Sequence, residues 1–579
     1  MRTGARLCAV TAALLLAGGC TGSINGPGDP SSPNPGSPGN GSGNGSGNGT
    51  GNPTGNPSTG GSSVVPGNPG DPNAAGPMPL RRMTRVEFNN TVHDLVGDTT
   101  SPANAFPLDR DPTFLFPLAG LVSLQDADTL KDAALALGKE AEAKATTLAP
   151  CAAGMAEDAC AKSFITSFGL KAYRRPVASD EADRLFALYT TGRTTLALSY
   201  AGAIGLLVEG IIQTPTFLYH WELGNGAPTV EGKVIRLNPY ELASRLSYFI
   251  YNSMPDQALF DAAAANQLGT TAALEAQVRR MMADPKGAGT VATFIDEWLN
   301  LDQVADRPKD PTVYPQFNAD LTTAMAAETH ALVDSVIKGD QKLSSLLTQT
   351  GSTVNQSLAA VYGVAGVKGT AMTPTTLNSA QRSGLLTRAD FLTVTGATDG
   401  SDPVKRGHRI YERLFCGVLP PPPNVVPAVA SAASSVGKTT RQRFEDHDMN
   451  PCSTACHSLM DPVGFFFENY DGIGQFRTMD NGGVVNASST ITIDGTKRTF
   501  NNAIELGQAL STSTDVGNCF STQWFRFATD RAETDDDQAS LTAIASAFKK
   551  TNSITDAMIG VATSRSFRYR SPATGEMLQ

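Results

Sequence analysis

Basic residues are in short supply, since 45 lysines and arginines face 55 aspartates and glutamates, for a net charge of −10. No block of basic residues occurs, and this absence argues against nucleic acid as a partner, because phosphate binding needs a positive stripe. The sequence also lacks a glycine-rich phosphate loop, a nucleophile elbow and an HExxH motif. It therefore gives no indication of P-loop nucleotide binding, α/β-hydrolase chemistry or zinc-protease chemistry.

The apolar run near the amino terminus, Leu7 to Leu16, is too short to cross a hydrocarbon layer of about 30 Å. Arginines precede it at positions 2 and 6, and small residues fill the three positions before Cys20. This order predicts a lipoprotein signal peptide over residues 1–19 and a lipidated Cys20. We therefore expect a lipid-anchored protein of the cell envelope, at the outer membrane and facing the periplasm or the cell surface.

Glycine, asparagine, serine and proline make up almost all of residues 20–78. Such a composition has too few apolar side chains to build a core and behaves as a solvated coil. We predict a disordered tether that holds the body away from the membrane.

Residues 79–579 exceed what one hydrophobic core normally serves, so several modules are expected. Apolar residues recur at helical spacing in most of this body, and two helix starts are explicit. Thr84 with Glu87, and Asn238 with Pro239 and Glu241, have the spacing of capping boxes. Near the carboxyl end, residues 484–500 alternate around Asp494-Gly495, which predicts a β-hairpin. The predicted fold is mainly α, with consecutive helical modules and one small hairpin.

Six cysteines remain for the mature body once Cys8 is removed with the signal peptide and Cys20 is lipidated. An even number in an oxidising compartment predicts pairing. Cys151 and Cys160 enclose a short loop, and we expect a local disulfide between them. The other four are Cys416, Cys452, Cys456 and Cys519.

The segment NPCSTACH places Cys452, Cys456 and His457 together. Two thiols followed by histidine is the attachment pattern of c-type haem, with His457 as the proximal iron ligand, although the spacing here is three residues and not two. Haem at this segment leaves Cys416 and Cys519 for a further disulfide. Without haem, the four cysteines form two disulfides, and a third reading is a zinc site of three thiols with His457. If haem is bound, His447 or Met479 is the candidate distal ligand.

Several motifs resemble, in order, those of the planctomycete-type secreted cytochrome-like proteins, a multi-module family of unknown function that is also common in myxobacteria. The motifs are LRRMTRVEFNNTVHDLVG, FGLKAYRRPVASDEADRLFALY, LNPYELASRLSYFIYNSMPD, RSGLLTRADFLTVT with the cysteine segment, and CFSTQWFRFATDR with SFRYR. The resemblance implies a helical body that ends in a cytochrome-like module and a last module, and a co-exported protein partner. With these motifs the expected boundaries are 79–150, 151–230, 231–365, 366–480 for the module with CxxxCH, and 481–579.

Two function classes follow from these observations. The first is an exported, membrane-anchored protein with covalent haem c that transfers electrons or uses peroxide at the cell surface. The second is a haem-free, disulfide-stabilised scaffold or binding protein for polysaccharide or for a co-exported protein. The sequence places no nucleophile beside a base, so it names no catalytic residue and no substrate.

Overall fold

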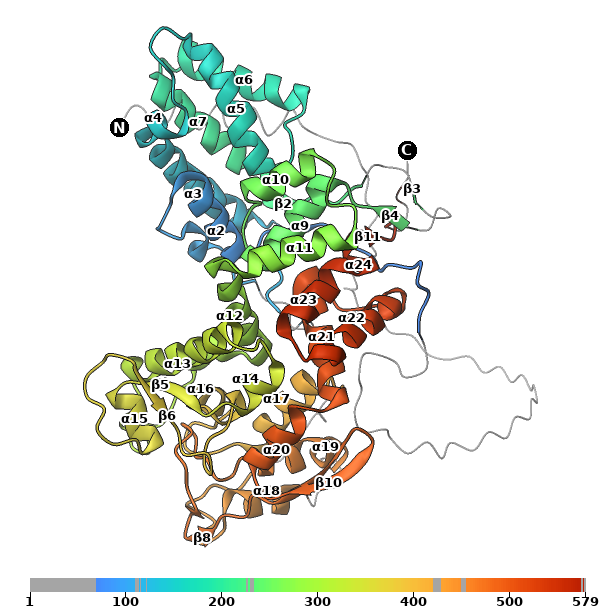
Figure 1. Ribbon diagram of the computed structural model, residues 1–579. Helices are drawn as coiled ribbons and strands as arrows, with labels where there is room; N and C mark the ends of the chain where they lie inside the picture. Colours follow the sequence, from blue (N-terminus) through green and yellow to red (C-terminus); the bar gives the residue numbers. More distant parts are fainter. Residues whose placement is uncertain are drawn as a thin grey trace, which may run out of the picture. The chain divides into compact units, whose positions relative to one another are not determined.

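The computed structural model describes residues 69–109, 114, 116–120, 122–224, 228–229, 234–419, 429–448, 454–573 and 576. The signal peptide, Cys20 and most of the predicted tether lie outside this range and stay predictions. Within it the chain is mainly helical, with short antiparallel strand pairs, as the sequence predicts (Figure 1). None of the helices in the described part of the chain combines the length and the apolar content that a bilayer crossing requires.

The first helices share a core formed by residues between Met83 and Leu218, joined by Tyr248 and Met254. The helix α3 lies along α7, and α6 packs on the other side of α7. The capping box predicted for Thr84 and Glu87 is present at the start of α2. The elements are α2 (Arg85–Val96), η1 (Pro102–Ala105), α3 (Leu124–Ala143), α4 (Ala145–Leu148), α5 (Glu157–Tyr173), α6 (Ser179–Thr194), α7 (Tyr200–Ile212) and α8 (Pro215–Leu218).

The next elements connect this part to the carboxyl end. The strand β1 pairs with β2, and β4 pairs with both β3 and β11, so the last strand of the chain lies beside a strand of the middle. The capping box at Asn238 and Glu241 opens α9 as predicted. The elements are β1 (Arg81–Arg82), β2 (Tyr219–His220), β3 (Pro228–Thr229), β4 (Val234–Arg236), α9 (Pro239–Tyr251), α10 (Gln257–Ala264), α11 (Thr271–Met282), α12 (Pro285–Leu299), η2 (Leu301–Asp306), α13 (Ala319–Lys338), α14 (Leu343–Thr348), β5 (Gly351–Val354), α15 (Gln356–Tyr362) and β6 (Thr373–Thr376).

The carboxyl-terminal third shares a large apolar core with α9 to α14. The helix α17 packs along α19, and α21, α22 and α23 contact one another. The elements are η3 (Leu385–Thr387), α16 (Ala389–Val394), α17 (Pro403–Leu414), α18 (Thr440–Asp448), α19 (Thr454–Phe465), β7 (Met479–Asp480), β8 (Gly483–Val484), β9 (Ser489–Ile493), β10 (Thr496–Phe500), α20 (Ala503–Leu510), α21 (Thr514–Thr529), η4 (Asp535–Asp537), α22 (Gln538–Thr551), α23 (Ile554–Thr563), α24 (Arg565–Arg568) and β11 (Tyr569–Arg570).

The predicted hairpin is formed by β9 and β10, with Asp494 and Gly495 both at positive φ in the turn. It is shorter than predicted, because Val484 belongs to β8 and pairs with Met479. Residues 69–78 also differ from the prediction, since they lie against the last module and not in a tether. The backbone N–H of Gly76 donates to Asp537 at 3.0 Å, and Ala75 is buried. Composition alone does not predict this contact, because it uses backbone groups.

Candidate functional site

The helix α19 carries the cysteine segment that the sequence singled out. Cys452 lies outside the described residues, as do the side chains of Cys456 and His447. Their predicted roles therefore stay predictions. The backbone places Cys456 and His457 in the first turn of α19, and α18, which carries His447, contacts α19.

His457 is held by a carboxylate one helical turn further along. Its Nδ1 atom lies 3.0 Å from Oδ2 of Asp461, and the two side chains are 12% and 2% exposed. Residues four apart lie on the same face of a helix, so this contact follows from the sequence spacing. The contact fixes the ring and directs Nε2 away from Asp461. A carboxylate on the second ring nitrogen is the usual support of a metal-ligating histidine.

The helix that carries His457 is braced by its neighbour α17. Two glycines allow the backbones to touch: a Cβ atom on Gly464 would lie 1.8 Å from the carbonyl oxygen of Pro403, and one on Gly407 would lie 1.9 Å from that of Met460. The fully buried Arg406 of α17 donates to the carbonyl oxygens of Phe467 and Tyr470 at 3.0 and 2.9 Å, directly after α19. Two glycines and one arginine therefore pack α19 closely against α17.

Both disulfides of the described residues bear on the predicted pairing. Cys151 is joined to Cys160, and Cys416 is joined to Cys519, so the expectation of disulfides in this body is confirmed. The second bond connects the end of α17 to α21 in the last module. It is the pairing that haem attachment at Cys452 and Cys456 would leave, and it also occurs in one set of pairings without haem.

The two candidate distal haem ligands lie on elements other than α19. Met479 lies on β7 with 53% of its surface exposed, and His447 lies on α18. Both stay predictions as distal ligands. In the described part of the chain, no three or more His, Cys, Asp or Glu side chains come close enough to hold a metal ion. The predicted zinc site of three thiols with His457 is wrong, because the Cys416–Cys519 disulfide leaves only Cys452 and Cys456 as possible thiol ligands.

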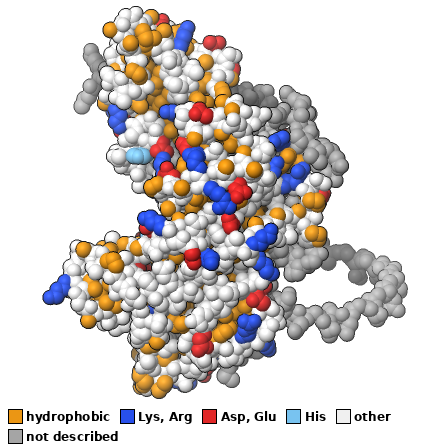
Figure 2. All heavy atoms as spheres, viewed as in Figure 1, with side chains coloured by type: hydrophobic (Ala, Val, Ile, Leu, Met, Phe, Trp, Pro, Cys, Tyr) orange, Lys and Arg blue, Asp and Glu red, His pale blue; other side chains and the backbone are white. Residues whose placement is uncertain are grey.

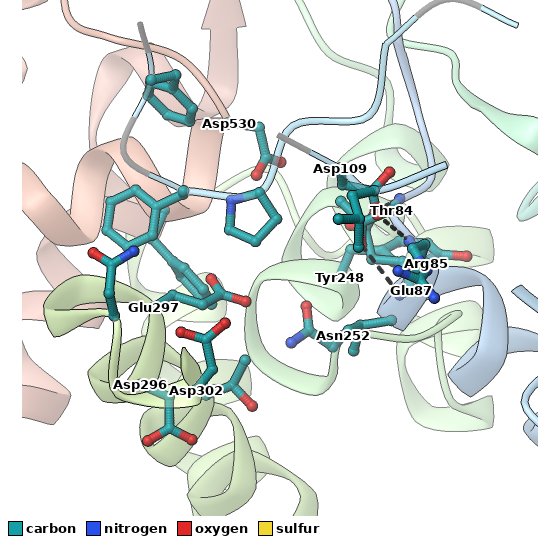
Figure 3. Close-up of a pocket in the computed structure, with 18 of the residues that line it drawn as sticks. Thr84, Arg85, Glu87, Asp109, Tyr248, Asn252, Asp296, Glu297, Asp302 and Asp530 are labelled. Carbon is teal, nitrogen blue, oxygen red and sulfur yellow. Dashed lines mark hydrogen bonds between the residues drawn. The ribbon is translucent and has the colours of Figure 1, made fainter. Parts of the chain in front are cut away.

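A second site, which the sequence did not predict, is a cavity of about 950 Å³ at the junction of four modules. Figure 3 shows Asp296, Glu297 and Asp302 on one side, Thr84, Arg85 and Glu87 on the other, and Asp530 on a separate segment. This volume is large enough for a small organic ligand. The lining residues include Arg81, Asp109, Phe114, Phe116, Tyr248, Phe249, Asn252, Asn300, Arg413 and Phe527.

The carboxylates that line this cavity have pKa values shifted in opposite directions. Burial alone would raise the pKa of Glu87, but the charges of Arg81 at 3.1 Å and His220 outweigh it and lower the pKa. Burial raises the pKa of Asp530, although Arg81 lies 2.9 Å away. Burial, together with the charges of Asp530 and three further carboxylates, raises the pKa of Glu297 well above its usual range. Perturbed carboxyls in a cavity are typical of functional sites.

The sequence held a weak signal for this cavity. Glu297 occurs in FIDEWLN, where acidic residues interrupt a run of buried aromatic and aliphatic side chains on α12. Within one segment this pattern reads as the edge of an amphipathic helix. Only the fold brings it beside Asp530, which lies more than two hundred residues later.

On the face drawn in Figure 2, acidic and basic side chains are scattered among each other and form no patch of one sign. The two candidate sites differ from this mixed surface. One is a histidine held by a carboxylate on α19, and the other is a cavity lined by many carboxylates.

Comparison with protein families finds five models along the chain. Each is described as a protein of unknown function: DUF1587 at residues 81–141, DUF1595 at 160–222, DUF1592 at 237–364, DUF1588 at 382–480 and DUF1585 at 496–567. No curated protein and no solved structure matches the chain. His457 and Asp461 lie within the DUF1588 match, and the cavity is lined by residues of four of the five matched regions. The five matches confirm the resemblance drawn from the motifs, and the chain belongs to the planctomycete cytochrome-like multi-module family.

Proposed function

We propose that this protein is an exported, lipid-anchored cytochrome that carries one covalent haem c in its fourth module. The observation that supports this proposal is His457, whose ring is oriented by Asp461 at 3.0 Å on a helix braced by α17. A haem ligand has to keep one ring orientation through a change in the charge of the iron, and a buried carboxylate provides that orientation.

The residues that would hold the group are Cys452 and Cys456 through thioether bonds and His457 through Nε2. When bound, haem supplies one-electron transfer, or peroxide chemistry if a coordination position stays open. Asp461 keeps the proton of His457 on Nδ1 and so fixes the tautomer. Either His447 or Met479 would supply the distal ligand.

The anchor belongs to the same proposal. A diacylated Cys20, followed by a glycine-rich and asparagine-rich tether, would hold the body at the envelope in reach of a co-exported partner. Cys20→Ala should abolish incorporation of radiolabelled palmitate and release the protein from the membrane fraction. Equal labelling of the wild type and of Cys20→Ala would contradict the anchor.

The haem is tested with full-length protein expressed in a host that attaches c-type haem in its periplasm. We expect a Soret band and a pyridine haemochrome that survives denaturation. Cys452→Ser with Cys456→Ser should lose the covalent haem, whereas Cys151→Ser with Cys160→Ser, which removes a disulfide elsewhere, should keep it. Absence of a haemochrome from folded wild-type protein would overturn the haem proposal.

Asp461→Asn tests the positioning role separately. The variant keeps the shape of the side chain but removes the negative charge beside His457. If haem is bound, the reduction potential should rise, because a less basic histidine stabilises the oxidised iron less. An unchanged potential would mean that Asp461 has only a structural role.

The second candidate is a haem-free binding protein stabilised by disulfides. The observation that favours it is the cavity, since about 950 Å³ lined by aromatic and acidic side chains is suited to a ligand. In that case Cys452 and Cys456 should be found as a disulfide by mass spectrometry. The cavity is compatible with either candidate, because His457 is not among the residues that line it.

A further inference from the structure

Three helices end at the cavity, and each ends in the same way. The helices α9, α12 and α21 are followed by Asn252, Asn300 and Asp530, which adopt left-handed conformations with φ of 50°, 57° and 48°. All three of these capping residues line the cavity. The carboxyl end of a helix carries a partial negative charge of about half an electron, so three such ends make the cavity attractive to a cation.

One helix presents its amino end, but the chain itself neutralises that end. The helix α2 begins at the cavity, where Thr84 and Glu87 form a capping box. The carboxylate of Asp109 accepts a hydrogen bond from the backbone N–H of Arg85 at 2.5 Å. The positive end of α2 is therefore already occupied by two carboxylates and does not offset the other three helix ends.

Charged side chains add to the negative potential. Six carboxylates line the cavity and three arginines face them. Arg81 is paired with Glu87 and Asp530, and Arg413 with Glu412 at 3.3 Å. The Arg85 guanidinium donates to the carbonyl oxygens of Ala103 and Asn104. The arginines are thus committed to partners within the chain.

None of these three arginines pairs with Glu297. No hydrogen bond or ion pair to its side chain occurs in the part of the chain that the structure describes. The charged groups that act most strongly on it are acidic: Asp530 after α21, Asp302 on η2, Asp296 on its own helix and Glu87 on α2. A partly buried carboxylate that has no partner, and whose strongest charged neighbours are acidic, is stabilised by a positive charge brought from outside.

Aromatic rings supply the rest of the lining. Phe114, Phe116, Phe249 and Phe527 contribute to the same cavity as Glu297. The ring of Phe116 lies 5.6 Å from that of Phe527. The faces of aromatic rings attract organic cations, and the rings also pack against an apolar body.

We propose that this cavity binds a small organic cation, an ammonium group attached to an apolar body, with the carboxylate of Glu297 as its counter-ion and the phenylalanine rings around it. The proposal does not depend on haem at Cys452 and Cys456. The pKa of Glu297, which is raised in the free protein, should fall when the cation binds, so binding should release a proton.

The test is isothermal titration calorimetry of the full-length protein with phenethylammonium, and with phenethyl alcohol as a neutral probe of similar size. We expect the cation to bind with a Kd of about 1 mM or tighter, and the alcohol to bind at least about tenfold more weakly. In two buffers of different ionisation enthalpy, the heats should differ because a proton is released. The affinity for the cation should rise with pH above the usual titration range of a glutamate, because the free protein must lose the proton of Glu297 to bind it.

Glu297→Gln keeps the size of the side chain and removes its charge. It should weaken phenethylammonium binding by about tenfold or more and abolish the proton release, without affecting the alcohol. Glu157→Gln is the matched control, because Glu157 is half exposed on α5 and is not among the residues that line the cavity. Melting curves establish that both variants fold.

Three results would overturn the proposal: no binding of phenethylammonium to folded wild-type protein, equal affinity for the alcohol, or unchanged binding to Glu297→Gln. Loss of binding in Glu157→Gln to the same extent would equally contradict a role for Glu297.

Discussion

Two glutamates of this protein, the fully buried Glu328 and the partly buried Glu297, lie in opposite surroundings. Glu328 is fully buried on α13, forms an ion pair with Arg388 at 2.9 Å, and accepts hydrogen bonds from Tyr362 and Ser352. Arg388 also donates to the carbonyl oxygens of Gln349 and Gly351. Glu297, on the neighbouring α12, lines the cavity, and the charged groups that act most strongly on it are acidic.

This comparison distinguishes two kinds of carboxylate. Glu328 is paired within the chain and stabilises the fold, whereas Glu297 is available to a ligand. A buried ion pair with hydrogen-bonded partners holds elements of the chain together and leaves no charge for a ligand. A carboxylate without a partner destabilises the fold, and its presence is explained by something outside the chain. Substitutions at the two glutamates should therefore have opposite effects on stability.

The largest effect is expected from breaking the satisfied pair. Glu328→Gln leaves the buried Arg388 without a counter-charge and should lower the free energy of unfolding by about 3–5 kcal/mol. Glu157→Gln, which removes an exposed partner of Arg193, should cost less than about 1 kcal/mol. Denaturant unfolding of both variants provides the measurement, and equal losses would remove the distinction between the two kinds of pair.

The next effect concerns the support of His457. Gly464→Ala would place a Cβ atom 1.8 Å from the carbonyl oxygen of Pro403 and force α19 away from α17. We expect a loss of about 3 kcal/mol in unfolding free energy. The helical control is Gly289→Ala on α12, where no atom lies within 4 Å of the added group and a gain of up to about 1 kcal/mol is expected. If Gly464→Ala is as stable as the wild type, α19 is not braced in this way.

A smaller effect of opposite sign is expected at the cavity. Glu297→Gln removes a carboxylate that lacks a partner, so at neutral pH and without ligand the variant should be more stable than the wild type, by about 1 kcal/mol. A melting temperature that falls by several degrees would show that Glu297 supports the fold, and the contrast with Glu328 would disappear.

The stability gained by Glu297→Gln should depend on pH. The pKa of Glu297 is higher in the folded chain than in the unfolded chain, so the folded chain binds more protons between the two values. Stability therefore falls as pH rises through this window. The difference in melting temperature between Glu297→Gln and the wild type should be near zero below about pH 4.5 and grow above it. A difference that is constant with pH would contradict this origin.

Local signals in the sequence predicted local structure well. The capping residues Thr84 and Asn238 start their helices as expected, and Asp494-Gly495 turns the hairpin. These features depend on interactions within a few residues, which the sequence shows directly. Asp461 is also readable in this way, because it follows His457 at helical spacing.

The cavity was not predictable for the opposite reason. It combines residues near positions 85, 250, 300 and 530, and no single segment contains the pattern of three helix ends around one carboxylate. The hydrogen bond from the Gly76 N–H to Asp537 is not predictable from composition either, because the donor is a backbone group. Long-range pairing of this kind needs the fold.

The most direct test of the proposed function is mass spectrometry of one peptide. Trypsin should release residues 444–477, which contain His447, Cys452, Cys456 and His457. From envelope protein made in a host that attaches c-type haem, we expect this peptide with one haem on its two cysteines. The same peptide with a Cys452–Cys456 disulfide and no haem would contradict it.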